Sequence, residues 1–481
     1  MSRLLPLIVC LMVALAGCPA TQPDSSDSSG AHSLAGTTVR LAVVDDPQLA
    51  VALGVLQGEW QAQTGSDFEL VSLSEDQLLD AEMLEPDAVI CPSYCLGVLA
   101  EKGAIQPAPG KLQPEKLGRE DNNSWSGVFE LLRLREATFG GSLYGVPFGS
   151  PVLFCYYRAD LLEQLGRRPP ETWSEYHELA ELLAEQKPEH AREDFYPALE
   201  PLGSGWGALV LLARAGAYAK HPNNYSTLFD IQTMEPRIAS PPFVRALEEL
   251  VATAKLAGTK PHCATPTEVR AAFWRGECGM ALTWPTAAAP GIPKDVPGEM
   301  EVGFAELPGS KAVFHPDFHK WETRREGDET HVPLLGSAGR IGVVSASSQQ
   351  AEAAFQLLGW LAGEQFSSQT CPQSAATTMF RTSHLSFPLK WTESPVSPAA
   401  AADFGRVAEA AFSRQQYLMA PRIPGRSEYL ATLDEAVRDA VGGHKSPAEA
   451  LQVAVEKWIA ITEKLGLENQ KHAYLHSLGL K

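Results

Sequence analysis

The sequence TVRLAVV at Thr38–Val44 is followed by DDP at 45–47 and by an amphipathic segment at 49–63. An apolar, β-branched run predicts a buried strand, and apolar residues at helical spacing after a polar turn predict a helix. The strand pattern returns at 68–73 and again at 87–91. Strands that alternate with helices are typical of an α/β fold, with a mostly parallel sheet covered by helices on both faces.

The rest of the chain continues this alternation with longer helical stretches. We expect helices at 174–186, 206–219, 242–257, 350–362, 400–412 and 447–465, and further strands at 280–284, 302–307 and 340–345. The chain has 481 residues, whereas a single hydrophobic core stops growing at roughly 250 to 300 residues. The sequence therefore predicts at least two packed units.

The charge balance narrows the class of partner. The chain carries 39 Lys and Arg residues against 58 Asp and Glu residues, a formal net charge of −19, and 44% of its residues are apolar. That composition is typical of a globular protein. Because binding to nucleic acid needs clustered cationic side chains, the negative balance argues against a nucleic-acid partner.

The first residues predict export. Residues 4–16 are an apolar run, too short for a bilayer that needs roughly 20 residues, so we interpret 1–17 as a signal peptide. The tetrapeptide LAGC at 15–18 resembles the bacterial lipobox, which implies that Cys18 is lipidated and becomes the mature N-terminus; an ordinary signal peptide with a chance cysteine is the alternative. Residues 18–36 are rich in Ser, Gly, Pro and Asp and predict a flexible tether. We therefore expect an extracytoplasmic protein, in the periplasm or at the cell surface, that is held at a membrane by the lipid on Cys18.

Six further cysteines fall in the body of the chain. They are Cys91, Cys95, Cys155, Cys263, Cys278 and Cys371. Export permits disulfides, but six cysteines allow fifteen pairings, so the pairing is left open, and small buried thiols are the alternative. No CxxC spacing occurs among them, which gives little support to a redox or zinc-ribbon site.

Seven short motifs occur in one order along the body. They are PDAV at 86–89, YGVP at 144–147, YYRADL at 156–161, PPETWSE at 169–175, AFWRGECGM at 272–280, a strand ending in Leu-Pro at 302–308, and APRIP at 420–424. In this order they resemble the family 1 extracellular solute-binding proteins, the binding components of ABC importers. The resemblance covers about residues 38–465.

This resemblance implies a two-lobed fold of the periplasmic-binding-protein type II class, with a ligand cleft between the lobes. The first lobe would comprise 37–149 and about 338–395, and the second would comprise 150–337 and about 396–481. The resemblance also implies a monomer that captures a small polar solute, expected to be a carbohydrate, and delivers it to ABC permease subunits. A lipoprotein that uses the same fold for ligand sensing or protein interaction is the alternative.

Candidate ligand contacts follow from the strand ends and from positions matched to the family. From the first lobe we expect Asp46, Ser93 and Tyr94, with Ser150 at the first crossing between lobes; from the second lobe we expect Trp206, Trp284, Arg426 and Tyr429. Polar loops after strands line clefts in open α/β sheets, and a flat ring can bury the apolar face of a sugar. The alternatives are a helix cap for Asp46, core packing for each Trp, and a surface ion pair for Arg426.

The sequence departs from the maltose-binding members of that family at several platform positions. Gly203 and Ser204 stand where those relatives have aromatic residues, and Cys91 and Leu430 replace tryptophans. A long maltodextrin groove is therefore not expected.

No catalytic set survives inspection of the sequence. GSGWG at 203–207 fails the nucleophile-elbow register, and we find no P-loop or dinucleotide-binding motif. His315, Asp317, His319 and His331 could bind a metal, but their charged surroundings favour a solvated insertion. We therefore expect a binding protein that is not an enzyme and has no cofactor and no metal site.

Overall fold

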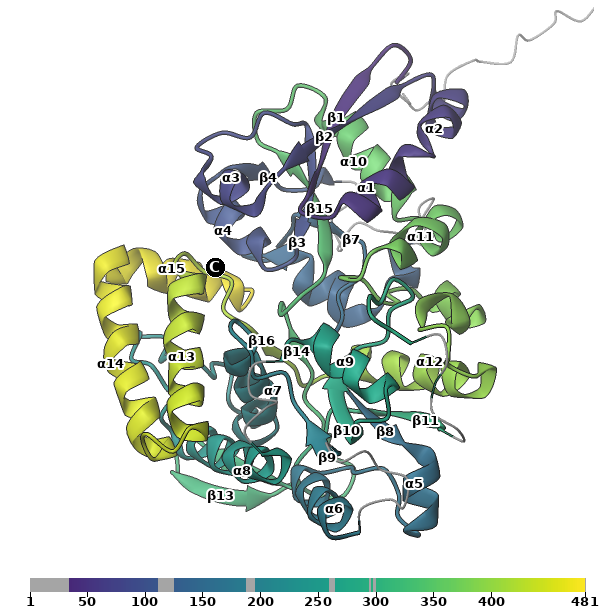
Figure 1. The fold of residues 1–481 in the computed structure, drawn as a ribbon. Helices are drawn as coiled ribbons and strands as arrows, with labels where there is room; N and C mark the ends of the chain where they lie inside the picture. The colour runs from purple at the N-terminus through teal and green to yellow at the C-terminus, as the bar shows by residue number, and fades with distance from the viewer. Residues whose placement is uncertain are drawn as a thin grey trace, which may run out of the picture.

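The computed structural model describes residues 34–110, 125–186, 195–258, 264–293, 296 and 300–480. The predicted signal peptide, Cys18, most of the tether and Cys263 lie outside the described residues. The described chain folds into two α/β lobes, one above the other in the view of Figure 1.

The first lobe is built on a six-stranded sheet (Figure 1). Its strand order is β2 (Asp67–Leu73), β1 (Thr38–Val44), β3 (Ala88–Pro92), β15 (Arg340–Ser345) and β4 (Ile105–Gln106), with β7 (Gly145–Pro147) also paired to β15. The surrounding helices are α1 (Pro47–Gly54), α2 (Gln57–Thr64), α3 (Glu75–Asp80), α4 (Cys95–Glu101), α10 (Ala351–Leu361) and α11 (Glu364–Thr370). The helix predicted at 49–63 is thus two helices, because the chain turns at Leu56, which is 6% exposed and packs into the core.

The second lobe is built on a four-stranded sheet. Its order is β11 (Val302–Glu306), β8 (Phe154–Arg158), β10 (Cys278–Thr283) and β9 (Tyr196–Leu199). The helices of this part are α5 (Ala159–Gln164), α6 (Trp173–Glu185), α7 (Gly207–Ala219), α8 (Pro241–Ala257), α9 (Pro266–Trp274) and α12 (Pro398–Phe412). The chain ends in α13 (Arg426–Val441), α14 (Pro447–Leu465) and α15 (Leu467–Ser477); α13 and α14 pack against each other and on α8.

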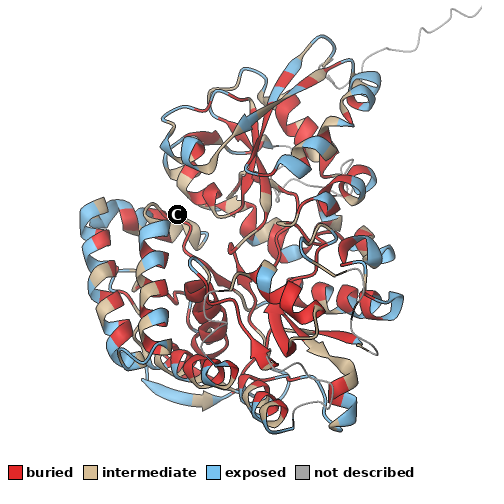
Figure 2. Ribbon diagram, in the orientation of Figure 1, coloured by how far each residue is buried: buried red, intermediate tan, exposed pale blue. Residues whose placement is uncertain are grey.

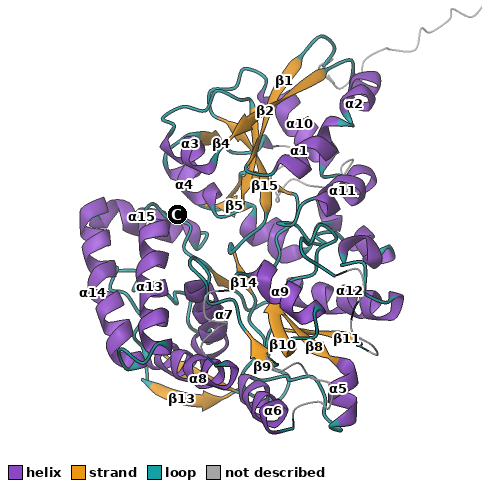
Figure 3. Cartoon of the chain, viewed as in Figure 1, coloured by secondary structure: helices purple, strands orange, loops and turns teal. Residues whose placement is uncertain are grey.

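The structure also contains short strands and single-turn helices. Three two-stranded sheets are β5 (Thr138–Phe139) with β6 (Ser142–Leu143), β12 (Ala312–His315) with β13 (Lys320–Thr323), and β14 (Leu334–Leu335) with β16 (Leu418–Met419). Single-turn helices lie at Trp125–Gly127, Leu132–Glu136, Cys371–Gln373, Thr382–Ser386 and Pro388–Trp391. Figure 3 shows that loops dominate the region between the two main sheets.

The two main sheets are mixed, which corrects the prediction of mostly parallel sheets. Strand β1 is parallel to β2 and β3, but β15 is antiparallel to β3, β4 and β7, and β8 is antiparallel to both of its neighbours. Strand β8 enters the second lobe directly after β7, and β15 returns to the first lobe directly after β14. Neither strand follows a crossover helix, and antiparallel pairing does not need one.

The core is continuous across both sheets. Strand β10 is buried along its whole length and β1 is buried from Leu41 to Val44, as the red interior strands of Figure 2 show. The five described cysteines of the body carry free, buried thiols, so Cys91 and Cys95 are not bridged to each other. Within the described part of the chain, no helix combines the length and the hydropathy that crossing a bilayer requires.

Candidate functional site

The two crossing segments between the lobes lie side by side and fix the region where a cleft could form. The Phe148 amide donates to the carbonyl of Arg340, and the Arg340 amide donates to the carbonyl of Gly149, both at 2.8 Å. Gly339 has φ +118°, and a Cβ there would lie 2.3 Å from Ser150 Oγ. Glycine is therefore required where the two crossings touch.

Ser93 and Ser150 surround a buried carboxyl group that sequence reasoning missed. Ser93 Oγ lies 2.8 Å from Oε1 of Glu136 and 3.0 Å from the carbonyl oxygen of Ala338. Burial raises the pKa of Glu136, and hydrogen bonding to Ser150 and Ser93 opposes that rise only in part. Glu136 ends the turn at Leu132–Glu136, and no motif in its sequence singles it out. Both serines are nearly inaccessible, at 1% and 2% exposed, and their ligand role stays a prediction.

Both carboxylate oxygens of Asp46 accept hydrogen bonds from other groups of the protein. It caps α1 by accepting from the Leu49 amide at 3.2 Å, and its other oxygen accepts from Arg340 Nε at 3.0 Å and from Ser374 Oγ at 2.5 Å. The side chain is 6% exposed. The helix-cap alternative of the sequence analysis therefore accounts for Asp46, and any ligand role needs one of these bonds to be exchanged.

Tyr94 and Arg426, predicted from opposite lobes, are brought into contact. The guanidinium carbon of Arg426 lies 3.9 Å from the centroid of the Tyr94 ring, a cation–π geometry. The Tyr94 hydroxyl donates to Glu75 at 2.8 Å, and burial raises the pKa of Tyr94. Arg426 begins α13 and reaches the carbonyl of Gly336 at 3.4 Å, while burial lowers its pKa. Both side chains are half-buried, so each keeps an accessible face.

Trp206 and Trp284 also lie together, as a tilted ring pair. Their centroids are 5.5 Å apart with an interplanar angle of 38°. Trp206 precedes α7 and is half-buried, whereas Trp284 follows β10 and is 6% exposed. The Trp284 indole donates at 3.2 Å to the carbonyl of Ala375, in the segment that follows the turn packed on α1. This pair thus joins the second sheet to the first lobe.

A buried ion pair between Arg270 and Glu393 contacts Trp284 through its backbone carbonyl. Arg270 donates to the carbonyl of Trp284 at 2.6 Å, and its Nε lies 3.3 Å from Glu393 Oε1. The Tyr156 hydroxyl donates to the same carboxylate at 3.0 Å. Burial raises the pKa of Glu393 to about 7, against an opposing effect of Arg270. Sequence reasoning missed this pair because its members lie 123 residues apart in the printed sequence.

Tyr429 is a correction to the predicted site. Its side chain is 0% exposed, its hydroxyl lies 2.8 Å from Thr462 Oγ1, and its ring packs edge-on against Phe229 and Trp458. Tyr429 lies one turn of α13 beyond Arg426, close to the position expected from the sequence, but on the helix face that packs into the core. It cannot contact a solute without repacking that core.

The start of α7 is occupied by an acidic residue that sequence reasoning also missed. Asp434 accepts from the amides of Gly205 and Ala208, each at 3.1 Å, and is 3% exposed. Arg438 binds the same carboxylate at 2.8 Å. The helix N-terminus beside Trp206 therefore already holds an anionic partner, which favours a neutral rather than an anionic solute there.

The histidines near 315–331 do not gather into a metal centre. Among the described residues, His315, Asp317, His319 and His331 do not form a group of three close enough to share one ion. His315 is buried against the rings of Phe318 and His221.

The mixed sheets and the paired crossings give the chain the two-lobed fold of the periplasmic-binding-protein type II class. The chain belongs to the family described as bacterial extracellular solute-binding protein, whose model matches residues 47–366. Membership of this family places the protein outside the cytoplasm and makes solute binding its general function.

Solved structures of similar fold include solute-binding proteins, two of them with bound polyols. An ABC transporter solute-binding protein from Agrobacterium radiobacter K84, in complex with ribitol, is 19% identical with a TM-score of 0.63, over 89% of this chain and 99% of that one. A solute-binding protein from Agrobacterium vitis S4 with bound D-mannitol is 18% identical with a TM-score of 0.61, over 89% and 99%. The sugar-binding protein MalE from Xanthomonas citri is 18% identical with a TM-score of 0.66, over 89% and 98%. At these identities the likeness establishes the fold.

Proposed function

We propose that this protein captures a small sugar or polyol between its lobes and delivers it, unconverted, to an ABC importer. The family match supports solute binding, and two of the similar structures hold the polyols ribitol and D-mannitol. The departures from the maltose-binding pattern at Gly203 and Ser204 favour a small solute over a long oligosaccharide.

The proposal is supported by the Trp206–Trp284 ring pair, whose Trp284 indole bonds to Ala375 of the first lobe, and by the Tyr94–Arg426 pair, whose members come from opposite lobes. The half-buried ring of Trp206 can cover the C–H face of a sugar, and Arg426 has donors for two neighbouring hydroxyls. A solute that touches both pairs favours the closed arrangement of the lobes, because it gains contacts from each side only when they approach. Asp46, Ser93, Ser150 and Trp284 then contribute by shaping and holding the boundary.

A thermal-shift panel of sugars, polyols, amino acids and organic acids tests the solute class. A ligand present at 100 times its dissociation constant stabilises the folded state by roughly 2.7 kcal/mol, which a melting curve resolves. We expect at least one sugar or polyol to raise the melting temperature. A response to amino acids or organic acids alone would contradict the proposed class.

We also propose that diacylation of Cys18 anchors the protein, with 18–36 as a tether and the lobe boundaries at 149/150, about 337/338 and about 395/396. Support comes from the lipobox-like LAGC at 15–18 and from the extracellular family. A Cys18→Ser variant should be recovered in the soluble fraction after a high-salt wash, whereas the parent stays with membranes. Retention of the variant in the membrane fraction would remove lipidation as the anchor.

A further inference from the structure

The C-terminal helix α15 meets the first-lobe helix α4, and this contact brings three metal-ligating side chains together. Glu101 is the last residue of α4, while His472 and His476 are four residues apart and therefore share one face of α15. His472 Nδ1 lies 3.1 Å from Glu101 Oε2, and His476 Nδ1 lies 2.9 Å from Glu101 Oε1. The two imidazole centroids are 3.9 Å apart.

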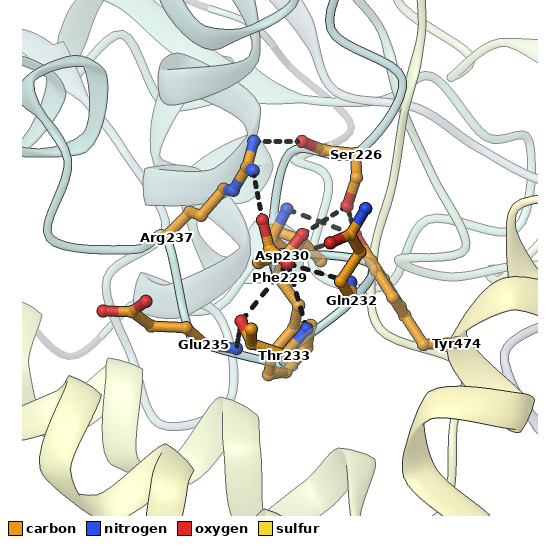
Figure 4. A network of polar contacts seen from close by, with 9 residues as sticks. Ser226, Phe229, Asp230, Gln232, Thr233, Glu235, Arg237 and Tyr474 are labelled. Carbon is orange, nitrogen blue, oxygen red and sulfur yellow. Dashed lines mark hydrogen bonds and ion pairs between the residues drawn. The ribbon is translucent and has the colours of Figure 1, made fainter. Parts of the chain in front are cut away.

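Tyr474, which lies between the two histidines in the sequence, is held by a loop of the second lobe (Figure 4). The Tyr474 hydroxyl lies 2.8 Å from Ser226 Oγ and accepts from the amides of Leu228 and Phe229 at 3.3 and 3.4 Å. The loop that bears these groups is closed by Asp230, which pairs with Arg237 at 2.8 Å. Because Tyr474 lies between His472 and His476 in the sequence, its anchorage fixes which face of α15 points to α4.

The His476 ring is further held by the first lobe. Phe139 meets it edge-on, with centroids 5.7 Å apart, and the Gly140 amide donates to the His476 carbonyl at 2.9 Å. Gly140 has φ +56°, and a Cβ there would lie 3.3 Å from His476 Cγ. The glycine thus gives the imidazole room while keeping it against Glu101.

We propose that Glu101, His472 and His476 form a zinc site that joins the two lobes. The candidate ligand atoms all lie within 4.8 Å of one another, and ligand atoms around a tetrahedral zinc stand about 3.3 Å apart. Two imidazoles and a carboxylate suit Zn²⁺, whereas Mg²⁺ and Ca²⁺ prefer sites made of oxygen ligands. In the metal-bound form each ring keeps its proton on Nε2 and offers its Nδ1 lone pair.

The exposure of the three side chains leaves one side of the site open to solvent. The side chains of Glu101 and His476 are 15% and 25% exposed, whereas that of His472 is 62% exposed. A water molecule can therefore complete the coordination. No metal site is expected from the sequence, although HAYLH at 472–476 carries the histidine spacing, because the third ligand, Glu101, lies far away in the sequence.

Zinc binding to the untagged full-length chain, measured by isothermal titration calorimetry, tests this proposal. We expect one Zn²⁺ per chain, and affinity at least about tenfold weaker in Glu101→Gln and in the double variant His472→Gln/His476→Gln. His177→Gln is the matched control, because His177 also faces a glutamate four residues away, Glu181, at 3.5 Å, but this pair belongs to no three-ligand group among the described residues. This control should bind zinc like the parent, and Mg²⁺ should give no stoichiometric binding.

Two outcomes would overturn the zinc site. One is the absence of stoichiometric zinc binding by a parent chain that melts cooperatively. The other is parent-like zinc affinity in both Glu101→Gln and the double histidine variant. Melting curves in the presence of a chelator show whether the variants fold. We expect them to fold, because His472 is exposed and Gln preserves the size of Glu101. The test needs no solute and so is independent of the proposed transport function.

Discussion

Asp46 and Trp206 both lie near the boundary between the lobes, but the Asp46 side chain is fully bonded within the protein, whereas the Trp206 ring is partly exposed. Both oxygens of the Asp46 carboxylate are occupied within the protein, by Leu49, Arg340 and Ser374. Trp206 instead shares one ring contact with Trp284 and stays half-buried. We therefore propose that Asp46 helps to hold the boundary together, while Trp206 keeps a ring face that a solute can contact.

Replacing Asp46 should give the largest effect on stability. Asp46→Ala removes the cap of α1 and leaves the Arg340 guanidinium, 11% exposed, without its carboxylate. Loss of one partner of a buried ion pair costs about 3 to 5 kcal/mol, so the unfolding free energy measured by denaturant titration should fall by about that amount. The exposed Asp317→Ala is the control and should change stability by less than about 0.5 kcal/mol. Equal stability of Asp46→Ala and parent would show that Asp46 is free for a ligand.

Glu393, the carboxylate partner of Arg270, should make the free energy of unfolding depend on pH. Its pKa is raised from 4.5 to about 7 in the folded protein, so the folded chain binds the proton more tightly than the unfolded chain. This group therefore stabilises the fold at low pH, and that contribution is lost as the pH rises from about 4.5 to about 7, by at most about 3 kcal/mol.

Glu393→Gln removes the titrating group while keeping its shape. Stability curves at several pH values should show the parent losing stability relative to this variant between pH of about 4.5 and about 7. Glu326→Gln, at an exposed position, should leave the parent's pH dependence unchanged. A constant difference between parent and Glu393→Gln across this range would contradict the raised pKa.

Replacing Trp206 should give the smallest of these effects, and on binding rather than folding. Trp206→Ala should weaken the affinity for the solute at least about tenfold, the equivalent of about 1.4 kcal/mol. The melting temperature of the ligand-free protein should change little. Tyr429→Phe is the control, because Tyr429 is buried away from solvent and should leave the affinity unchanged. Unchanged affinity in Trp206→Ala would place the site elsewhere.

Local sequence patterns predicted the elements well, but not their directions or long-range contacts. The strand predicted at 340–345 is β15 with the same bounds. Its antiparallel direction depends on where the chain re-enters the first lobe, which periodicity does not encode. Tyr429 was misplaced for a similar reason, since its ring partner Phe229 lies 200 residues earlier in the printed sequence. Glu136 and Glu101 acquire their roles only from partners brought close by the fold.

We propose that a small sugar or polyol binds reversibly and leaves chemically unchanged. Isothermal titration calorimetry of the full-length chain with the best solute from the panel, followed by mass spectrometry of the recovered solute, tests it most directly. We expect one binding site per chain, loss of affinity in Trp206→Ala, and a recovered solute of unaltered mass. A product of different mass, or saturable binding that Trp206→Ala and Arg426→Ala leave intact, would contradict it.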